Sequence, residues 1–288
     1  MRDFDFLEPA TVAEACRMLA DLGDECRVIA GGTALLLGMR QRMLAPGHLV
    51  SLGRLSSLRQ IDFDERNGLR IGALASHADI ARSALVQARY PMLASMATRV
   101  ANPQVRNQGT IGGNLCYADP STDPPACLMV LQAQVVIQGQ GGERLLAMDE
   151  FLVDYFTTAL GSDEVVTAIR LPVAPAQATG IYSRMLRTAA EHRPLVSVAL
   201  QASRQGDVCR EARLAVGAAT PIPVRVERAE AFLAGKAVTQ QVAVEAADMV
   251  ADDVETLSDL RGSAGYRRDM VRVVARRTIA ELFGLQSL

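Results

Sequence analysis

The sequence predicts an α+β protein of two lobes. Its 288 residues suffice for two domains, since a domain usually takes about 100–150 residues. Near the N-terminus a β-type run, a glycine turn, a helical stretch and a second β-type run follow one another. In the last third of the chain, three β-type runs precede three helical ones. The first order is typical of a βαβ unit and the second of an α+β layer.

Composition is that of an ordinary folded protein and excludes some partners. Hydrophobic residues make up 49% and charged residues 22%, near the globular average. The net charge of -2 gives no general attraction for nucleic acid or anionic lipid. The N-terminus lacks an apolar signal core, and apolar runs such as residues 34–37 are far short of the ~20 residues that span a bilayer. We therefore expect no membrane span, no nucleic-acid partner and a cytoplasmic location.

The five cysteines are scattered and include no Cys-x-x-Cys pair. This pattern argues against a disulfide framework and against an iron–sulfur site. We interpret the cysteines as small buried hydrophobes and expect no metal site in this chain.

The first 55 residues predict a helix followed by the βαβ unit. Thr11 and Glu14 have capping-box spacing, and Gly23 supplies the C-terminal stop. The βαβ unit comprises residues 26–30, 34–44 and 48–52.

Beyond residue 55 the pattern changes. A β-type run at residues 69–73 precedes Ser76-x-x-Asp79, which can start a helix through about residue 88, and Pro91 opens another helix. Residues 102–125 are rich in Gly, Asn, Asp and Pro with little periodicity, and a loop of that length is usually functional. Further strands are expected at residues 135–138, 144–147 and 165–171.

The domain boundary is predicted at residues 172–177, where prolines and small residues interrupt both periodicities. This divides the chain into an N-terminal domain, residues 1–173, with subdomains of about 1–55 and 56–173, and a C-terminal domain, residues 178–288. The C-terminal domain is expected to have a three-stranded sheet with three helices. Its strands are expected at residues 180–186, 195–202 and 211–217, and its helices near 224–234, 240–251 and 263–283.

Two glycine turns are candidate binding segments. Gly31-Gly32-Thr33 lies between a strand and a helix, where the backbone can approach a ligand and helix N–H groups can face an anion. Residues 110–114 repeat that chemistry with a hydroxyl, two glycines and an amide. Two such turns suit a ligand with two phosphates, although each taken alone is more simply interpreted as a tight turn. Neither has Walker A or Gly-x-Gly-x-x-Gly spacing, which argues against a nucleotide triphosphatase and a Rossmann domain.

Two carboxylates lie in the same long segment. Asp119 and Asp123 can accept hydrogen bonds from sugar hydroxyls or cap local turns. Composition alone favours turn capping.

Three motifs, in chain order, give the sequence a family resemblance. They are Ala30-Gly31-Gly32-Thr33; Arg106-Asn107-x-x-Thr110-Ile111-Gly112-Gly113-Asn114 with Ala118-Asp119-Pro120-x-x-Asp123; and Ser263-Ala264-x-Tyr266-Arg267-Arg268 followed by Arg276-Arg277. Together they resemble the FAD-binding medium subunits of the molybdenum hydroxylases, such as the medium subunit of carbon monoxide dehydrogenase and the FAD domain of xanthine dehydrogenase. The motifs span nearly the whole chain, which makes the resemblance far more specific than any one of them.

The resemblance implies a fold and a set of FAD-binding residues. The fold is a two-part FAD-binding domain of the vanillyl-alcohol oxidase and xanthine dehydrogenase type, followed by an α+β C-terminal domain of the carbon monoxide dehydrogenase flavoprotein type. Residues 29–35 and 110–114 would hold the pyrophosphate and its neighbours, and Asp123 the ribose or ribityl region. Arg184 would reach the flavin from the second lobe. The implied residues are Ile29, Ala30, Gly31, Gly32, Thr33, Ala34, Leu35, Val100, Thr110, Ile111, Gly112, Gly113, Asn114, Asp123, Val166 and Arg184, of which the two valines would line the cleft.

The resemblance also implies an electron-relay role. Substrate would be oxidised at a molybdenum–pterin centre in a large subunit, and electrons would cross two [2Fe-2S] clusters in a small subunit to FAD in this chain. From FAD they would pass to an external acceptor. The assembly implied is a dimer of heterotrimers, and no catalytic acid, base or nucleophile is expected here. A four-cysteine cluster insertion, which some relatives carry, does not fit the scattered cysteines.

One residue and two alternative functions stay open. His192 falls near a position where some relatives have an aromatic residue against the flavin, and we interpret it as a solvated loop histidine. One alternative is a self-contained FAD-dependent oxidoreductase, which needs placed acid–base groups for a small substrate. The other is a non-enzymatic interaction protein whose glycine segments are only turns, which bound flavin would eliminate.

Overall fold

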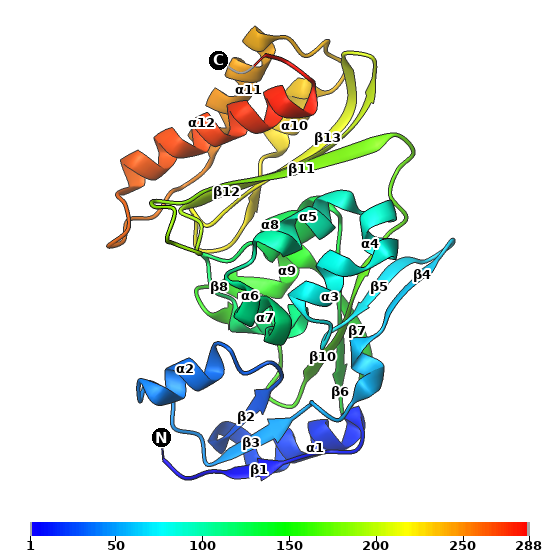
Figure 1. Ribbon diagram of the computed structural model, residues 1–288, viewed down its shortest axis with the longest axis vertical. Coiled ribbons are helices and arrows are strands. Elements are labelled where there is room, and N and C mark those ends of the chain that lie inside the picture. The colour runs from blue at the N-terminus through cyan, green and yellow to red at the C-terminus, as the bar shows by residue number, and fades with distance from the viewer. Residues whose placement is uncertain (1, 287–288) are drawn as a thin grey trace.

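Three sheets follow one another along the long axis of the molecule (Figure 1), in a computed structural model that describes residues 2–286. The N-terminal sheet has the order β1 (Asp5–Leu7), β3 (His48–Ser51), β2 (Cys26–Ile29). The middle sheet has the order β4 (Ile61–Asp64), β5 (Gly68–Gly72), β10 (Val165–Leu171), β6 (Gln134–Gly139), β7 (Gly142–Ala147). The C-terminal sheet has the order β11 (Ala178–Met185), β12 (Val196–Gln205), β13 (Val208–Gly217), β14 (Val224–Arg225), and a separate hairpin pairs β8 (Leu152–Asp154) with β9 (Thr157–Thr158).

The N-terminal sheet contains the predicted βαβ unit. Helix α1 (Val12–Leu22) begins after Thr11, whose hydroxyl accepts a hydrogen bond from the N–H of Glu14, and it ends at Gly23, whose φ is 54°. Strands β2 and β3 pair in parallel, with α2 (Leu35–Arg40) in the crossover between them. This confirms the unit, although α2 is shorter than the helical pattern indicated, and the edge strand β1 was not predicted.

The middle sheet is antiparallel, and its central strand is deeply buried. Strand β10 lies at its centre, between β5 and β6, and six of its seven residues are buried, which explains its nearly continuous hydrophobic sequence. Four helices lie beside this sheet (Figure 1): α3 (His77–Arg82), α4 (Ala84–Arg89), α5 (Pro91–Arg99) and α9 (Met148–Phe151). Ser76 forms the predicted capping box with Asp79, but Ser83 divides the expected single helix into α3 and α4.

The expectation of an irregular segment at residues 102–125 was wrong. The segment contains α6 (Pro103–Gln108), α7 (Ile111–Tyr117) and the start of α8 (Pro124–Val130). Side chains of Asn102 and Thr110 cap the first two, and prolines occupy the first positions of α6 and α8. Helices this short show no clear periodicity, so their cap signals were the only local evidence.

The C-terminal sheet packs helices on both faces. Helices α10 (Glu227–Leu233), α11 (Gln240–Asp253) and α12 (Ala264–Leu282) share a core with Val198 and Leu200 of β12. The intervening Ala199 belongs to the core of the middle region, where α5 and α8 contact the sheet. Strand β14 adds a fourth strand to the three that were predicted. The predicted boundary falls between β10 and β11, and the division into domains there stays a prediction.

Candidate functional site

The two predicted glycine turns lie against each other. A β-carbon on Gly31 would stand 2.0 Å from the carbonyl oxygen of Gln108 and 3.0 Å from the α-carbon of Gly109. A β-carbon on Gly113 would stand 3.8 Å from the β-carbon of Ala30. The structure therefore brings together two segments that are far apart in the sequence, and the contact at Gly31 requires a residue without a side chain.

The first turn presents a run of backbone donors. Among residues 2–286, no protein oxygen accepts a hydrogen bond from the N–H groups of Gly31 to Leu35. Gly32 has a φ of 71°, a left-handed conformation that a larger residue rarely adopts. Successive N–H groups around such a residue form a concave site for an anion. The first turn can thus hold a phosphate through its backbone alone.

The second turn uses its backbone donors internally. The N–H groups of Ile111 and Gly112 donate to the carbonyl groups of Ala75 and Ala73, at 3.0 and 2.9 Å, and the next N–H donates to the hydroxyl of Thr110. The first turn of α7 is therefore satisfied by the protein. Its assignment to the pyrophosphate stays a prediction, and its side chains are what it can offer. The side-chain amide of Asn114 is itself hydrogen-bonded, to the hydroxyl of Thr122 at 2.7 Å.

Asp123 is hydrogen-bonded to residues of the C-terminal sheet. Its side chain is buried, and it does not cap α8, although it occupies the residue before that helix. Oδ1 accepts hydrogen bonds from the hydroxyl of Tyr182 at 2.7 Å and from Nη1 of Arg184 at 3.0 Å, while Oδ2 accepts from the same Nη1 at 3.2 Å. Burial raises the pKa of Asp123, and the guanidinium of Arg184 opposes that shift. Asp123 therefore joins two parts of the chain.

Arg184 is anchored at one nitrogen. Its Nη1 bonds Asp123 and lies 3.4 Å from the carbonyl oxygen of His192, whereas its other guanidinium nitrogens have no hydrogen-bond acceptor in the described part of the protein. Its side chain is only 14% exposed. The imidazole of His192 is itself exposed, in agreement with its interpretation as a solvated loop residue.

Asp119 both caps a turn and crosses to the C-terminal region. Its Oδ1 accepts a hydrogen bond from the N–H of Ser121 at 2.9 Å, as composition had favoured, and its carboxylate forms an ion pair with Arg193. Arg261 adds a second link, donating to the hydroxyl of Ser121 at 3.1 Å and to the carbonyl of Pro194 at 3.2 Å. Residues 119–123 are therefore tied to two loops beyond β11.

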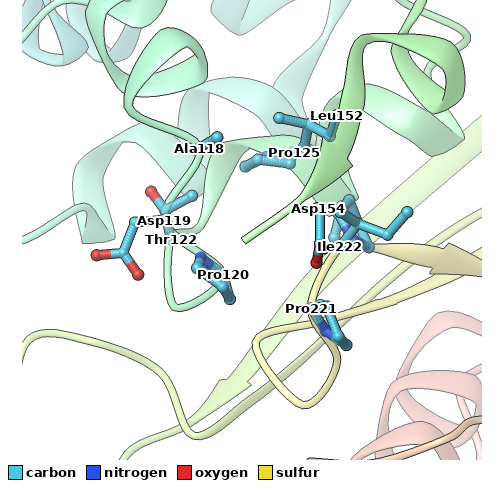
Figure 2. A pocket seen from close by; sticks show the side chains of 12 residues that line it. Ala118, Asp119, Pro120, Thr122, Pro125, Leu152, Asp154, Pro221 and Ile222 are labelled. Atoms are coloured by element: carbon cyan, nitrogen blue, oxygen red, sulfur yellow. The ribbon is translucent and has the colours of Figure 1, made fainter. Parts of the chain in front are cut away.

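A small pocket lies at this junction. Figure 2 shows Asp119, Pro120 and Thr122 at one side and, facing them from other elements, Asp154 of β8 and Ile222 before β14. The pocket is therefore lined by segments that are far apart in the sequence.

Four further predicted residues lie in or next to different elements of the fold. Ile29 ends β2 and Leu35 begins α2, and both are half-buried. Val100 follows α5 and Val166 lies in β10 beside a register shift, with exposures of 4% and 3%. Both valines belong to the core of the middle region.

Sequence reasoning missed Tyr182, Arg193 and Arg261. For Tyr182 a signal existed, because residues two apart in a strand share a face and Arg184 had been chosen. No local pattern marks the other two, since their partners come from the segment 119–121.

Comparison with known proteins extends over nearly the whole chain. A family model described as "FAD binding domain in molybdopterin dehydrogenase" matches residues 2–174, and one described as "CO dehydrogenase flavoprotein C-terminal domain" matches residues 181–282. The carbon monoxide dehydrogenase medium chain of Hydrogenophaga pseudoflava is 34% identical over 276 residues, which cover 96% of each chain. The glyceraldehyde dehydrogenase medium chain of Sulfolobus acidocaldarius is 31% identical, over 97% of this chain and 98% of the relative. A solved structure of carbon monoxide dehydrogenase from Hydrogenophaga pseudoflava contains a chain that matches with a TM-score of 0.92, covering 96% of both.

Proposed function

Because this chain belongs to the FAD-binding medium subunits of the molybdenum hydroxylase family, we propose that it passes electrons from [2Fe-2S] clusters on a partner subunit through FAD to an external acceptor. Bound FAD supplies the redox chemistry, in steps of one or two electrons. The residues of this chain bind the cofactor, orient it and surround it with fixed dipoles.

The N–H groups of Gly31 to Leu35, which have no protein acceptor within residues 2–286, are the observation that best supports this proposal. A pyrophosphate carries negative charge on several oxygens, and a concave array of backbone donors suits it. Gly31 keeps the array in place, because its close approach to the carbonyl of Gln108 holds the first turn against the segment that precedes the second.

The other predicted residues are assigned roles that fit their positions. Asp123 would accept a hydrogen bond from the sugar chain of FAD, and Arg184 would direct its remaining N–H groups to the ring. Val100 and Val166 would give apolar walls to the ring cleft, where water is excluded. The second turn would support the first and contribute the side chains of Thr110 and Asn114.

The proposed assembly follows the relatives, whose names describe medium chains and medium subunits. We assign a small subunit with [2Fe-2S] clusters and a large subunit with molybdenum–pterin as partners, arranged as a dimer of heterotrimers in the cytoplasm. None of the helices within residues 2–286 has the length and apolarity needed to cross a membrane. Within this chain, residues 1–173 would form the FAD-binding domain and residues 178–288 the C-terminal domain.

The test is to compare the isolated chain with the complete complex. Alone, the chain should bind one FAD noncovalently, shown by its visible absorbance, and should not oxidise purines, aldehydes, carbon monoxide or aromatic heterocycles. With its partners present, substrate should bleach the flavin band. Efficient turnover by the isolated chain would favour the self-contained oxidoreductase instead, and absence of flavin from both preparations would refute FAD binding.

A further inference from the structure

Tyr182 hydrogen-bonds Asp123, one of the predicted FAD-binding residues. Its hydroxyl donates to Oδ1 of Asp123 at 2.7 Å, and the two residues are 3% and 2% exposed. The carboxylate is at the end of the loop 119–123, whereas the phenol comes from β11 of the C-terminal sheet. The bond thus crosses between the two regions in a place closed to water.

The donors around the carboxylate are unevenly distributed. Among residues 2–286, Oδ1 takes the hydroxyl of Tyr182 and one contact from Nη1 of Arg184, while Oδ2 takes only the contact of 3.2 Å from that same Nη1. A carboxylate oxygen can accept two hydrogen bonds, so Oδ2 retains capacity for one more donor. A sugar hydroxyl is such a donor.

Within residues 2–286, the other polar side chains near Asp123 do not hydrogen-bond its carboxylate. Arg99 of α5 lies near the carboxylate but donates to the backbone carbonyl of Tyr182, at 3.0 Å. The thiol of Cys127, on α8, is near the carboxylate and buried, and it forms no hydrogen bond with it. Tyr182 is therefore the only uncharged group in the described chain that donates to Asp123.

We propose that Tyr182 is a positioning residue, whose hydroxyl fixes the carboxylate of Asp123 so that Oδ2 is presented to a hydroxyl of the FAD sugar chain. This inference rests on the proposed role of Asp123 in FAD binding. In this role Tyr182 would act through Asp123 and would not contact the cofactor itself. Without its hydroxyl, Arg184 alone would hold the carboxylate, by a single nitrogen, and the group could rotate.

The test measures the FAD dissociation constant between pH 5 and 8 for the wild type, Tyr182→Phe, Asp123→Asn and the double variant. We expect Tyr182→Phe to weaken FAD binding roughly tenfold, a loss typical of one charge-assisted hydrogen bond. As the pH is lowered, FAD affinity should fall at a higher pH in Tyr182→Phe than in the wild type. The charged carboxylate of Asp123 has lost a hydrogen-bond donor in this variant and therefore takes up a proton more readily. Asp123→Asn should show no such pH dependence, and the double variant should match it.

A matched control is Tyr266→Phe, which removes the hydroxyl of an exposed tyrosine on α12 and should leave both the affinity and its pH profile unchanged. If Tyr182→Phe does not fold, 3-fluorotyrosine placed at position 182 keeps the ring and strengthens the donor. The pH at which FAD affinity is lost should then be lower than in the wild type.

The outcomes separate this inference from the proposed function. A wild type that binds no FAD would contradict FAD binding itself. Two results would overturn only the role of Tyr182, provided that the wild type binds FAD. In the first, Tyr182→Phe keeps the wild-type affinity and pH profile. In the second, its effect adds in full to that of Asp123→Asn in the double variant.

Discussion

The carbonyl oxygen of Gln108 lies 2.0 Å from the position that a β-carbon on Gly31 would occupy. The contact is between two backbone segments, so neither can yield by rotating a side chain. It holds the donors of the first glycine turn against the segment that precedes the second.

Replacing Gly31 by alanine should therefore separate the two turns. We expect Gly31→Ala to lower the free energy of unfolding by about 1–3 kcal/mol, the usual cost of overpacking, and to abolish FAD retention. Gly38→Ala is the control, because its β-carbon would meet only the end of the Leu44 side chain, at 3.2 Å, and it lies in α2. That variant should keep FAD and stay within about 1 kcal/mol of the wild type. Equal behaviour of the two variants, measured by urea denaturation and flavin absorbance, would contradict the close approach.

Gly32 tests the left-handed conformation of the first turn. Valine at this position is strained by roughly 1–2 kcal/mol and should turn the neighbouring N–H groups away from the phosphate, with at least a tenfold loss of FAD affinity. Asparagine tolerates the left-handed region, so Gly32→Asn should retain FAD better than Gly32→Val. Fluorescence titration with FAD measures both. Full affinity in the valine variant would argue that this turn holds no phosphate.

Arg267 should contribute strongly to stability. It is fully buried, and it donates to the carbonyls of Leu195 and Ala218, at 2.7 and 2.9 Å, and to Asp259 at 2.6 Å. Arg267→Met removes the side-chain donor of the two buried carbonyls and the guanidinium that faces Asp259, and should cost about 3 kcal/mol. The exposed neighbour supplies the control, since Arg268→Met should change stability by no more than about 0.5 kcal/mol. Chemical denaturation of both variants decides the matter, and a similar small effect in each would be inconsistent with the buried network.

His77 should make stability depend on pH. Burial, reinforced by the charge of Arg106, lowers the pKa of His77 from 6.5 to about 4. Between these values the unfolded chain binds a proton that the folded chain does not, so the free energy of unfolding decreases as the pH falls from 6.5 to about 4. The loss is of the order of 3 kcal/mol.

His77→Gln should reduce that dependence, as measured by thermal unfolding at several pH values. His192→Gln removes an exposed histidine instead and should keep the wild-type profile. A wild-type slope in His77→Gln would mean that another group is responsible.

Local signals predicted the parts of the fold that local chemistry determines. Thr11 and Ser76 cap helices where their spacing indicated, and the Gly31-Gly32 turn joins a strand to a helix in a parallel βαβ unit. The resemblance in three motifs identified the family and its cofactor, which the comparisons confirm.

What the sequence could not show depends on partners distant along the chain. The N–H groups of Ile111 and Gly112 resemble an anion site until the carbonyls of Ala75 and Ala73 are seen to occupy them. Asp123 resembles a turn residue, but its donors come from β11. Neither pairing can be predicted from composition or from hydrophobic periodicity.

The polar contacts of residues 119–123 have a consequence for recombination between relatives. Asp119, Ser121 and Asp123 each have a partner beyond β10, in Arg193, Arg261 and the Tyr182–Arg184 pair, respectively. A chimaera that takes its C-terminal region from another parent must therefore inherit matching side chains at all of these positions. If position 184 brings no cation, the buried carboxylate at position 123 loses the guanidinium that pairs with it, so the two regions must be exchanged together.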